Sequence, residues 1–307
     1  EEKKIGYVFS LLKEIDSNYS GERLKTLYFG GGTPSILSVK ELSKIIDLFK
    51  QTSDCEVTIE VNPDDITKEY LYGLKEIGIN RVSMGAQTFD DNILKIIGRR
   101  HNAKQVVEAV KLAQKAGFEN ISLDLIYGLP KQTVEILKKD LNIILDLGVK
   151  HVSTYGLKVE KGTPLYRYPK NSIPDNDEQA DMYIMINDVL SKFDFYRYEV
   201  SNFSKPEFES KHNLNYWNNE EYYGFGVAAH GYVDCIRYSN INEIGAYLKE
   251  PIKHLNEHKL TSVEKIEEEI FLGFRKSEGI NTQKIYDKYG INFDNKYQNI
   301  LNKYSPD

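Results

Sequence analysis

The strongest constraint on the fold is an alternation of short apolar strands and amphipathic helices over the first 160 residues. Runs rich in β-branched and aromatic residues predict strands at 27–29, 57–61, 81–84, 121–127 and 151–159. Each run is followed by a helical pattern that ends near a glycine, at the roughly 30-residue spacing that is typical of βαβ units. Because βαβ crossovers are right-handed, this pattern predicts a parallel sheet, either as a barrel or as an open doubly wound sheet.

Helix boundaries can be read from capping residues. Ser38 with Glu41, and Asn102 with Gln105, have the spacing of capping boxes. Residues 1–4 predict the start of a charged helix, and residues 302–307 predict no closing element. The other helices are predicted from 38 onward and at 67–78, 90–97, 102–117, 133–148, 177–193, 264–274 and 280–289.

Polar residues stand at the end of every predicted strand. They are the run from Gly30 to Thr33, then Glu60, Gln87, Asp124 and Tyr155. The carboxyl ends of parallel strands meet at one edge, where barrels and open α/β sheets build their sites. Loop solvation and helix capping are the alternative for any single residue, but the recurrence in successive units favours a shared site.

The glycine run indicates a close approach of the backbone to a ligand. Three glycines followed by Thr33 and Pro34 can direct backbone N–H groups at a bound group. The run lacks the GxGxxG spacing of dinucleotide sites and the GxxxxGK[ST] spacing of phosphate loops. A Rossmann reductase and a nucleoside triphosphatase are therefore disfavoured.

The residues at the other strand ends restrict the chemistry of the expected ligand. Glu60 is suited to accept hydrogen bonds from a ribose diol, and Gln87 offers both a donor and an acceptor. Arg99 or Arg100 could bind a carboxylate with its forked guanidinium. Asp124 lies in an apolar strand, which is unfavourable unless the carboxylate is paired or bound. A ligand with a ribose, a carboxylate and an amine would satisfy this set.

Composition excludes several classes. The 307 residues have a net charge of −6 with no basic cluster, so nucleic acid is not an expected partner. No apolar run has membrane-spanning length and no signal peptide is visible, so a cytoplasmic protein is expected. Cys55 and Cys235 are far apart, which favours a reducing compartment, and each is interpreted as a small buried hydrophobe.

Four motifs occur in order and at the right spacing for one family. They are YFGGGTP at 28–34, IEVNP at 59–63, SMGAQ at 83–87 and DLIYGLP at 124–130. Over about residues 1 to 290 the chain resembles the oxygen-independent coproporphyrinogen III oxidases and their haem-chaperone relatives, which are radical S-adenosylmethionine (SAM) proteins. The resemblance implies an α/β fold, a partial (β/α)6 TIM-like barrel that lacks its first strand here, with an α+β C-terminal elaboration.

The resemblance also implies roles for individual residues. The methionine part of SAM would lie against Gly31, Gly32 and Thr33. The ribose and nearby groups would be bound by Glu60, Gln87 and Asp124. Arg99 matches the family's carboxylate-binding arginine, and Arg100 is second.

One departure from the family is large. The family places a CxxxCxxC loop after its first strand, where three thiolates hold a [4Fe–4S] cluster, and neither the strand nor the loop is present here. Cys55 and Cys235 have the wrong spacing to replace it. We expect the cluster-binding segment to lie outside these 307 residues, so that the chain as given holds no cluster, has no metal ligands of its own and cleaves no SAM. A natural protein without a cluster is the alternative.

The segment HNLNYW at 212–217 distinguishes the branches of the family. It resembles the HNxxYW motif of the haem-chaperone branch, whose members bind haem and pass it to acceptor proteins. His212 is a candidate axial ligand, and Tyr216 and Trp217 could line a porphyrin face. His230, in the glycine-rich stretch 224–231, also favours this branch. As alternatives, His212 and Asn213 could close a turn while Trp217 fills the core, and His230 could be buried and bonded to the backbone.

We therefore predict a haem chaperone that binds haem or a porphyrin, SAM and, in the full-length protein, a [4Fe–4S] cluster. An oxidase that converts coproporphyrinogen III to protoporphyrinogen IX and a cluster-less binding module are the alternatives, so enzymatic activity stays open and no catalytic residue is assigned. Haem-acceptor proteins are the expected macromolecular partners. The predicted domains are a barrel at 1–165, a family-specific α+β extension at 166–260 and the start of a winged-helix-like domain at 261–307.

Overall fold

The computed structural model describes residues 2–304, which are divided between two compact units. The parallel-sheet unit is Arg23–His212. The terminal unit combines the N-terminal segment up to Glu22 with the chain from Asn213 onward.

The parallel-sheet unit is built on a seven-stranded sheet with the order β1-β2-β3-β4-β5-β7-β6. The first five strands pair in parallel in chain order, which confirms the α/β prediction. By contrast, β7 is antiparallel to β5 and β6 is antiparallel to β7. The strands are β1 (Leu24–Phe29), β2 (Gln51–Val61), β3 (Arg81–Gln87), β4 (Asn120–Tyr127), β5 (His151–Gly156), β6 (Tyr196–Arg197) and β7 (Asn202–Ser204).

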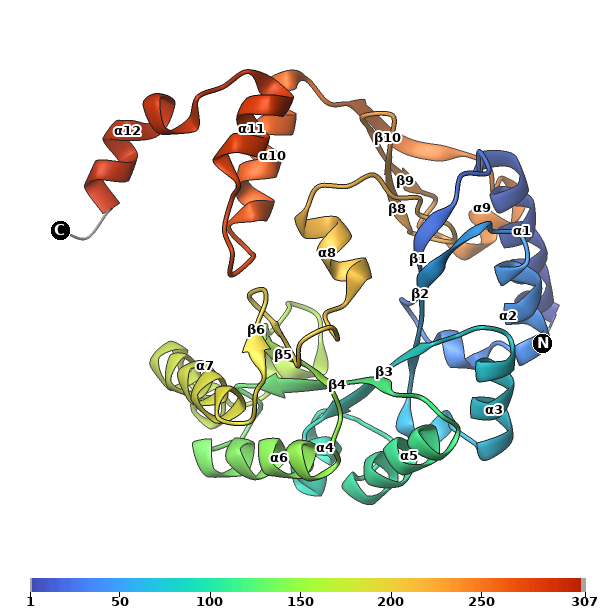
Figure 1. The fold of residues 1–307 in the computed structure, drawn as a ribbon. Coiled ribbons are helices and arrows are strands. Elements are labelled where there is room, and N and C mark those ends of the chain that lie inside the picture. The colour runs from blue at the N-terminus through green and yellow to red at the C-terminus, as the bar shows by residue number, and fades with distance from the viewer. Residues whose placement is uncertain (1, 305–307) are drawn as a thin grey trace. The chain divides into compact units, whose positions relative to one another are not determined.

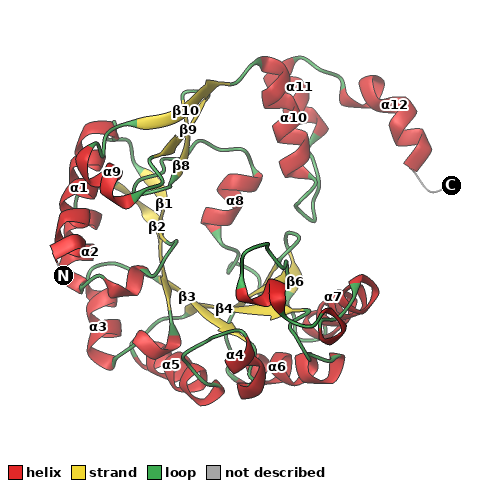
Figure 2. Ribbon diagram, turned by 180° about the vertical axis from the view of Figure 1, so that it is seen from behind, coloured by secondary structure: helices red, strands yellow, loops and turns green. Residues whose placement is uncertain are grey.

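Helices cover one face of this sheet (Figure 1), and the view from behind shows the same arrangement (Figure 2). They are α2 (Val39–Ile46), α3 (Lys68–Glu76), α4 (Asp91–Ile96), α5 (Ala103–Lys115), α6 (Val134–Asp146) and α7 (Asn176–Ser191). Short 3₁₀ helices are η1 (Pro34–Ile36), η2 (Pro63–Asp65), η3 (Pro164–Arg167) and η4 (Lys170–Ser172). Both capping boxes are confirmed, Ser38 with Glu41 on α2 and Asn102 with Gln105 on α5.

The core lies between the sheet and these helices. On β2, Val57 and Ile59 point into the core with 1% and 0% exposure, and they contribute to the same cluster as Leu71 of α3 and Val106 of α5. Because side chains alternate along a strand, Glu56 and Glu60 lie on the opposite face. The sheet therefore has an apolar face under the helices and a face that carries polar side chains.

The terminal unit has a three-stranded antiparallel sheet with the order β10-β9-β8. Its strands are β8 (His230–Val233), β9 (Ile236–Asn240) and β10 (His254–Lys259). Its helices are α1 (Glu2–Asn18), α9 (Ile244–Lys249), α10 (Ser262–Gly273), α11 (Thr282–Tyr289) and α12 (Phe293–Tyr304). Helix α8 (Lys211–Trp217) begins at the end of the parallel-sheet unit and continues into the terminal unit. Among residues 2–304, no helix combines the length and apolar character needed to cross a membrane.

Some local predictions are wrong. The strand predicted at 151–159 ends at Gly156, and α12 continues over 302–304, where no element was predicted. Residue 1 and residues 305–307 of the predicted termini lie outside the described residues. Helix α12 was missed because it is mostly polar, so its apolar pattern is weak. Phe293 is buried, and its ring centroid lies 4.7 Å from that of Tyr297.

The two cysteines differ in their surroundings. Cys55 is buried on β2, as interpreted from the sequence. Cys235 is only half-buried, because it lies in the tight turn between β8 and β9 with a φ of 63°. The interpretation of Cys235 as a buried hydrophobe is therefore wrong.

Candidate functional site

The glycine loop follows β1 directly. Gly31 and Gly32 have φ values of +71° and +42°, in the left-handed region that favours glycine, and both are exposed. A Cβ on Gly30 would lie 2.4 Å from a ring carbon of Tyr28 and 3.0 Å from Glu60 Oε1. Glycine at position 30 therefore leaves room for Tyr28 to reach Glu60, which accepts a 2.7 Å hydrogen bond from the Tyr28 hydroxyl.

Neighbouring strands place the predicted carboxylates on one face of the sheet. Glu60 of β2 lies opposite Ser83 of β3, and Asp124 of β4 lies opposite Gly85 of β3 and Ser153 of β5. The Ser83 hydroxyl donates to Asp124 Oδ1 at 3.3 Å. Burial raises the pKa of Asp124 to about 6, although hydrogen bonds from serine and the charge of Arg81 act against it. Asp124 is therefore ionised at neutral pH and takes up a proton in mildly acidic solution.

Gln87 ends β3 in a strained conformation. Its φ is 66°, and the pairing with β4 shifts register between Gly85 and Gln87. A Cβ on Gly85 would lie 2.7 Å from Gln87 Nε2, so glycine there makes room for the amide. The register shift is a β-bulge at the end of β3, and the Gln87 side chain is buried there.

Sequence reasoning missed the residue that holds the loop after Gln87. Asp140 of α6 is buried, and its carboxylate accepts from the Thr88 hydroxyl at 2.7 Å and from the Phe89 N–H at 2.8 Å. Burial raises its pKa to about 6. The sequence did carry a signal, because Asp140 interrupts the apolar stripe of α6 beside Leu137, Leu141 and Ile144.

The structure separates the two candidate arginines. Arg100 Nη2 forms ion pairs with Asp64 at 3.0 Å and Asp65 at 3.2 Å. Arg99 is exposed after α4, and its side chain has no ion pair or hydrogen bond with the residues that the structure describes. The carboxylates of η2 therefore engage Arg100 and not Arg99.

The strand-end residues match the chemistry of a nucleoside that carries an amino acid. Glu60 and Asp124 offer carboxylates, Gln87 an amide, Arg99 a guanidinium, and the loop at 31–33 exposed backbone. Ligands for an iron–sulfur cluster are not found in the part of the chain that the structure describes. Residues 2–304 contain no group of three His, Cys, Asp or Glu that could hold a metal ion. The chain's two cysteines, which lie in different units, do not supply three thiolates.

His212 occupies the first turn of α8, so the alternative in which it closes a turn is wrong. Its Nδ1 lies 3.0 Å from Thr26 Oγ1, and its ring stacks on Tyr28 with centroids 4.7 Å apart. Burial, with a contribution from the charge of Arg81, lowers the pKa of His212 to about 4. The imidazole is therefore neutral at physiological pH, which is the form that binds iron.

The other candidate haem residues belong to the terminal unit. Tyr216 meets Tyr222 edge to face at 4.6 Å, and the Arg275 guanidinium lies 4.5 Å from the Trp217 ring centroid. Trp217 is half-buried, so it does not fill the core as the alternative held. His230 begins the edge strand β8 and is exposed, so its alternative as a buried histidine is also wrong.

Comparisons with known proteins place this arrangement in a family. Residues 10–144 match the Radical SAM superfamily and residues 260–304 match the HemN C-terminal domain. Over 300 residues the chain is 43% identical to Heme chaperone HemW of Lactococcus lactis subsp. lactis, covering 95% of this chain and 79% of that protein. The chain belongs to the HemW family of radical SAM proteins.

A further HemW relative agrees with this assignment, and a solved structure has the same fold. Heme chaperone HemW of Bacillus subtilis is 41% identical, covering 91% of this chain and 76% of that protein. The solved structure of coproporphyrinogen III oxidase (HemN) from Escherichia coli, a radical SAM enzyme, superposes with a TM-score of 0.83. That match covers 98% of this chain and 76% of the oxidase at 21% identity, so it supports the fold of this HemW-family chain and not its activity.

Proposed function

We propose that this HemW-family chain is a haem chaperone that binds haem and SAM and delivers haem to acceptor proteins in the cytoplasm. The observation that carries the proposal is the 43% identity, over nearly the whole chain, to a relative named as a haem chaperone. The neutral His212 at the start of α8 supports it, because imidazole is a common axial ligand of haem iron. The [4Fe–4S] cluster of the radical SAM family would need ligands beyond the two cysteines of this sequence.

The proposed organisation keeps three parts. The barrel is assigned to 1–165, the α+β extension to 166–260 and the C-terminal domain to 261–307. The match of residues 260–304 to the HemN C-terminal domain supports the last boundary.

We assign SAM binding to the glycine loop and the strand ends. Gly31, Gly32 and Thr33 would approach the methionine part. Glu60, Gln87 and Asp124 would bind the ribose and nearby groups, and Arg99 the carboxylate. Bound SAM would supply the radical chemistry of the family only together with the cluster, so the part assigned to these residues is binding and orientation.

Replacing Glu60 by glutamine tests whether Glu60 binds the ribose of SAM. We expect S-adenosylhomocysteine to bind at least tenfold more weakly, because a charged acceptor of hydroxyl donors is lost. Isothermal titration of wild type, Glu60→Gln and Glu76→Gln measures this, and Glu76 is a suitable control because it is exposed on α3. Equal affinities for wild type and Glu60→Gln would remove Glu60 from the site.

We assign haem binding to His212, with Tyr216, Trp217 and His230 as further contacts. Replacing His212 by alanine is expected to weaken haem binding at least tenfold and to shift the Soret band, because an axial imidazole is lost. Haem titration of His212→Ala is compared with His258→Ala, since His258 is an exposed histidine that bonds to Glu264. Identical spectra and affinities for wild type and His212→Ala would exclude His212, and failure of the wild type to bind haem would exclude the chaperone function.

A further inference from the structure

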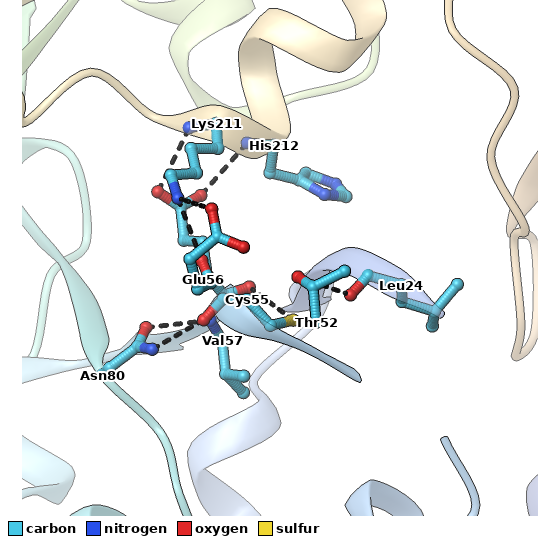
Figure 3. Close-up of polar contacts among 9 residues, drawn as sticks. Leu24, Thr52, Cys55, Glu56, Val57, Asn80, Lys211 and His212 are labelled. Atoms are coloured by element: carbon cyan, nitrogen blue, oxygen red, sulfur yellow. Dashed lines mark hydrogen bonds and ion pairs between the residues drawn. The ribbon is translucent and has the colours of Figure 1, made fainter. Parts of the chain in front are cut away.

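Helix α8 is anchored by a carboxylate from the sheet. Glu56 of β2 is 5% exposed, and its two oxygens accept from the backbone N–H groups of Lys211 and His212, each at 3.1 Å (Figure 3). The Ser210 hydroxyl donates to the same carboxylate at 3.4 Å. These donors precede or begin the helix, where N–H groups have no partner within the helix. Glu56 therefore fixes the backbone of His212 relative to β2.

Lys211 strengthens this anchor. Its ammonium lies 2.9 Å from both the carbonyl oxygen and the Oδ2 atom of Asp54, two residues before Glu56. The start of α8 is thus attached to β2 through both backbone and side-chain contacts.

The His212 ring is held by β1. Thr26 Oγ1 lies 3.0 Å from Nδ1, and the Tyr28 ring stacks on the imidazole at an interplanar angle of 14°. If Nδ1 carries the proton and donates it to Thr26, Nε2 is the basic nitrogen of the ring. The main chain of His212 is therefore set by β2, and its ring by β1.

Tyr28 connects this histidine to the strand-end site. The same ring that stacks on His212 carries the hydroxyl that donates to Glu60 Oε1 at 2.7 Å. Burial and the neighbouring Glu60 raise the pKa of Tyr28 far above its ordinary value, so the hydroxyl remains a donor at physiological pH. A single side chain thus contacts both the proposed ribose acceptor and the proposed haem ligand.

We propose that Tyr28 is a positioning residue that couples nucleoside binding at Glu60 to the orientation of the His212 ring. This inference rests on the proposed function, in which Glu60 binds the ribose and His212 binds haem iron. A ribose diol that orders the Glu60 carboxylate also orders the Tyr28 hydroxyl, and with it the ring on which His212 stacks. Haem then binds to an imidazole whose motion is already restricted, which gives positive cooperativity.

The test measures haem affinity with and without S-adenosylhomocysteine, a nucleoside that carries the ribose diol. In the wild type, saturating S-adenosylhomocysteine is expected to tighten haem binding about fivefold to tenfold, and haem to tighten S-adenosylhomocysteine binding by the same factor. In Tyr28→Phe, which keeps the ring and removes the hydroxyl, this factor is expected to fall to about one. We also expect S-adenosylhomocysteine to shift the Soret band of the wild-type haem complex, and this shift should be absent in Tyr28→Phe.

Two further variants make the outcome decisive. Tyr72→Phe removes an exposed hydroxyl that donates to the Lys115 carbonyl, and it should retain the full coupling factor. Should Tyr28→Phe fail to fold, Thr26→Val removes the hydroxyl that orients His212 and should reduce the coupling in the same way.

The possible failures are distinguishable. If wild type binds neither haem nor S-adenosylhomocysteine, the proposed function is wrong, and this inference is wrong with it. If wild type binds both but their affinities are independent, only the coupling is wrong. Retention of wild-type coupling in Tyr28→Phe, or in Thr26→Val where Tyr28→Phe does not fold, would likewise overturn the role of Tyr28.

Discussion

Replacing Glu14 by alanine is expected to destabilise the terminal unit by about 3 to 5 kcal/mol. Glu14 of α1 is fully buried and accepts a 2.9 Å hydrogen bond from the Gly226 N–H, with further hydrogen bonds from Asn240 Nδ2 and from the Tyr247 hydroxyl at 2.5 Å. These donors come from a loop, from β9 and from α9. Alanine would leave them without their acceptor in a buried place, which is among the costliest effects of a single substitution.

Tryptophan fluorescence is a suitable measurement, because Trp217 is the sole tryptophan of the sequence and belongs to the same unit as Glu14. Urea unfolding of Glu14→Ala should show a lower midpoint at an unchanged slope. Asp16→Ala, an exposed position on the same helix, should shift the free energy of unfolding by no more than about 0.5 kcal/mol. Equal midpoints for wild type and Glu14→Ala would contradict the structural role of the carboxylate.

Replacing Asp140 by alanine is expected to destabilise the parallel-sheet unit by about 2 to 4 kcal/mol, because the Thr88 hydroxyl and the Phe89 N–H lose a buried acceptor. The loop that follows Gln87 would lose its anchor on α6. We therefore also expect weaker binding of S-adenosylhomocysteine. Urea unfolding followed by far-UV circular dichroism, with Asp146→Ala on the same helix as the control, measures the stability, and calorimetric titration measures the affinity.

The raised pKa of Asp140 also implies that the free energy of unfolding depends on pH, with a defined sign. Its pKa is raised from 3.8 to about 6, so the folded state holds the proton more tightly than the unfolded state does. The stabilisation from the protonated form is complete below about pH 4 and is lost as the pH rises through about 6, by about 3 kcal/mol. Asp140→Asn keeps an acceptor for Phe89 but does not titrate, so its stability relative to wild type should increase between pH 4 and pH 7. A pH-independent difference between the two proteins would show that Asp140 does not titrate in this range.

Much of the fold could be predicted from local patterns. Strand propensity and glycine spacing located five parallel strands, and capping boxes located the starts of α2 and α5. The positions and the antiparallel pairing of β6 and β7 were not predicted, since strands of two and three residues carry too little periodicity. Helix α9 was missed for the same reason, because six residues form fewer than two turns.

The candidate site was predicted in part. Polar residues at the ends of strands indicated Glu60, Gln87 and Asp124, because parallel strands gather their carboxyl ends. The family resemblance ranked Arg99 above Arg100, but it did not indicate what Arg100 contacts. The ion pairs of Arg100 with Asp64 and Asp65, which are distant in sequence, form only in the fold.

The alternation of strands and helices, the order of the motifs and the chemistry of the strand ends were determined by the sequence alone. The contacts that position the backbone and the ring of His212 in the HNLNYW segment were decided only by the tertiary structure. Glu56 and Tyr28 are separated from His212 by more than 150 residues, and they meet it because β1 and β2 are adjacent in the sheet. Local propensity reports on neighbours along the chain, whereas these hydrogen bonds and ring contacts form only once the sheet has brought distant residues together.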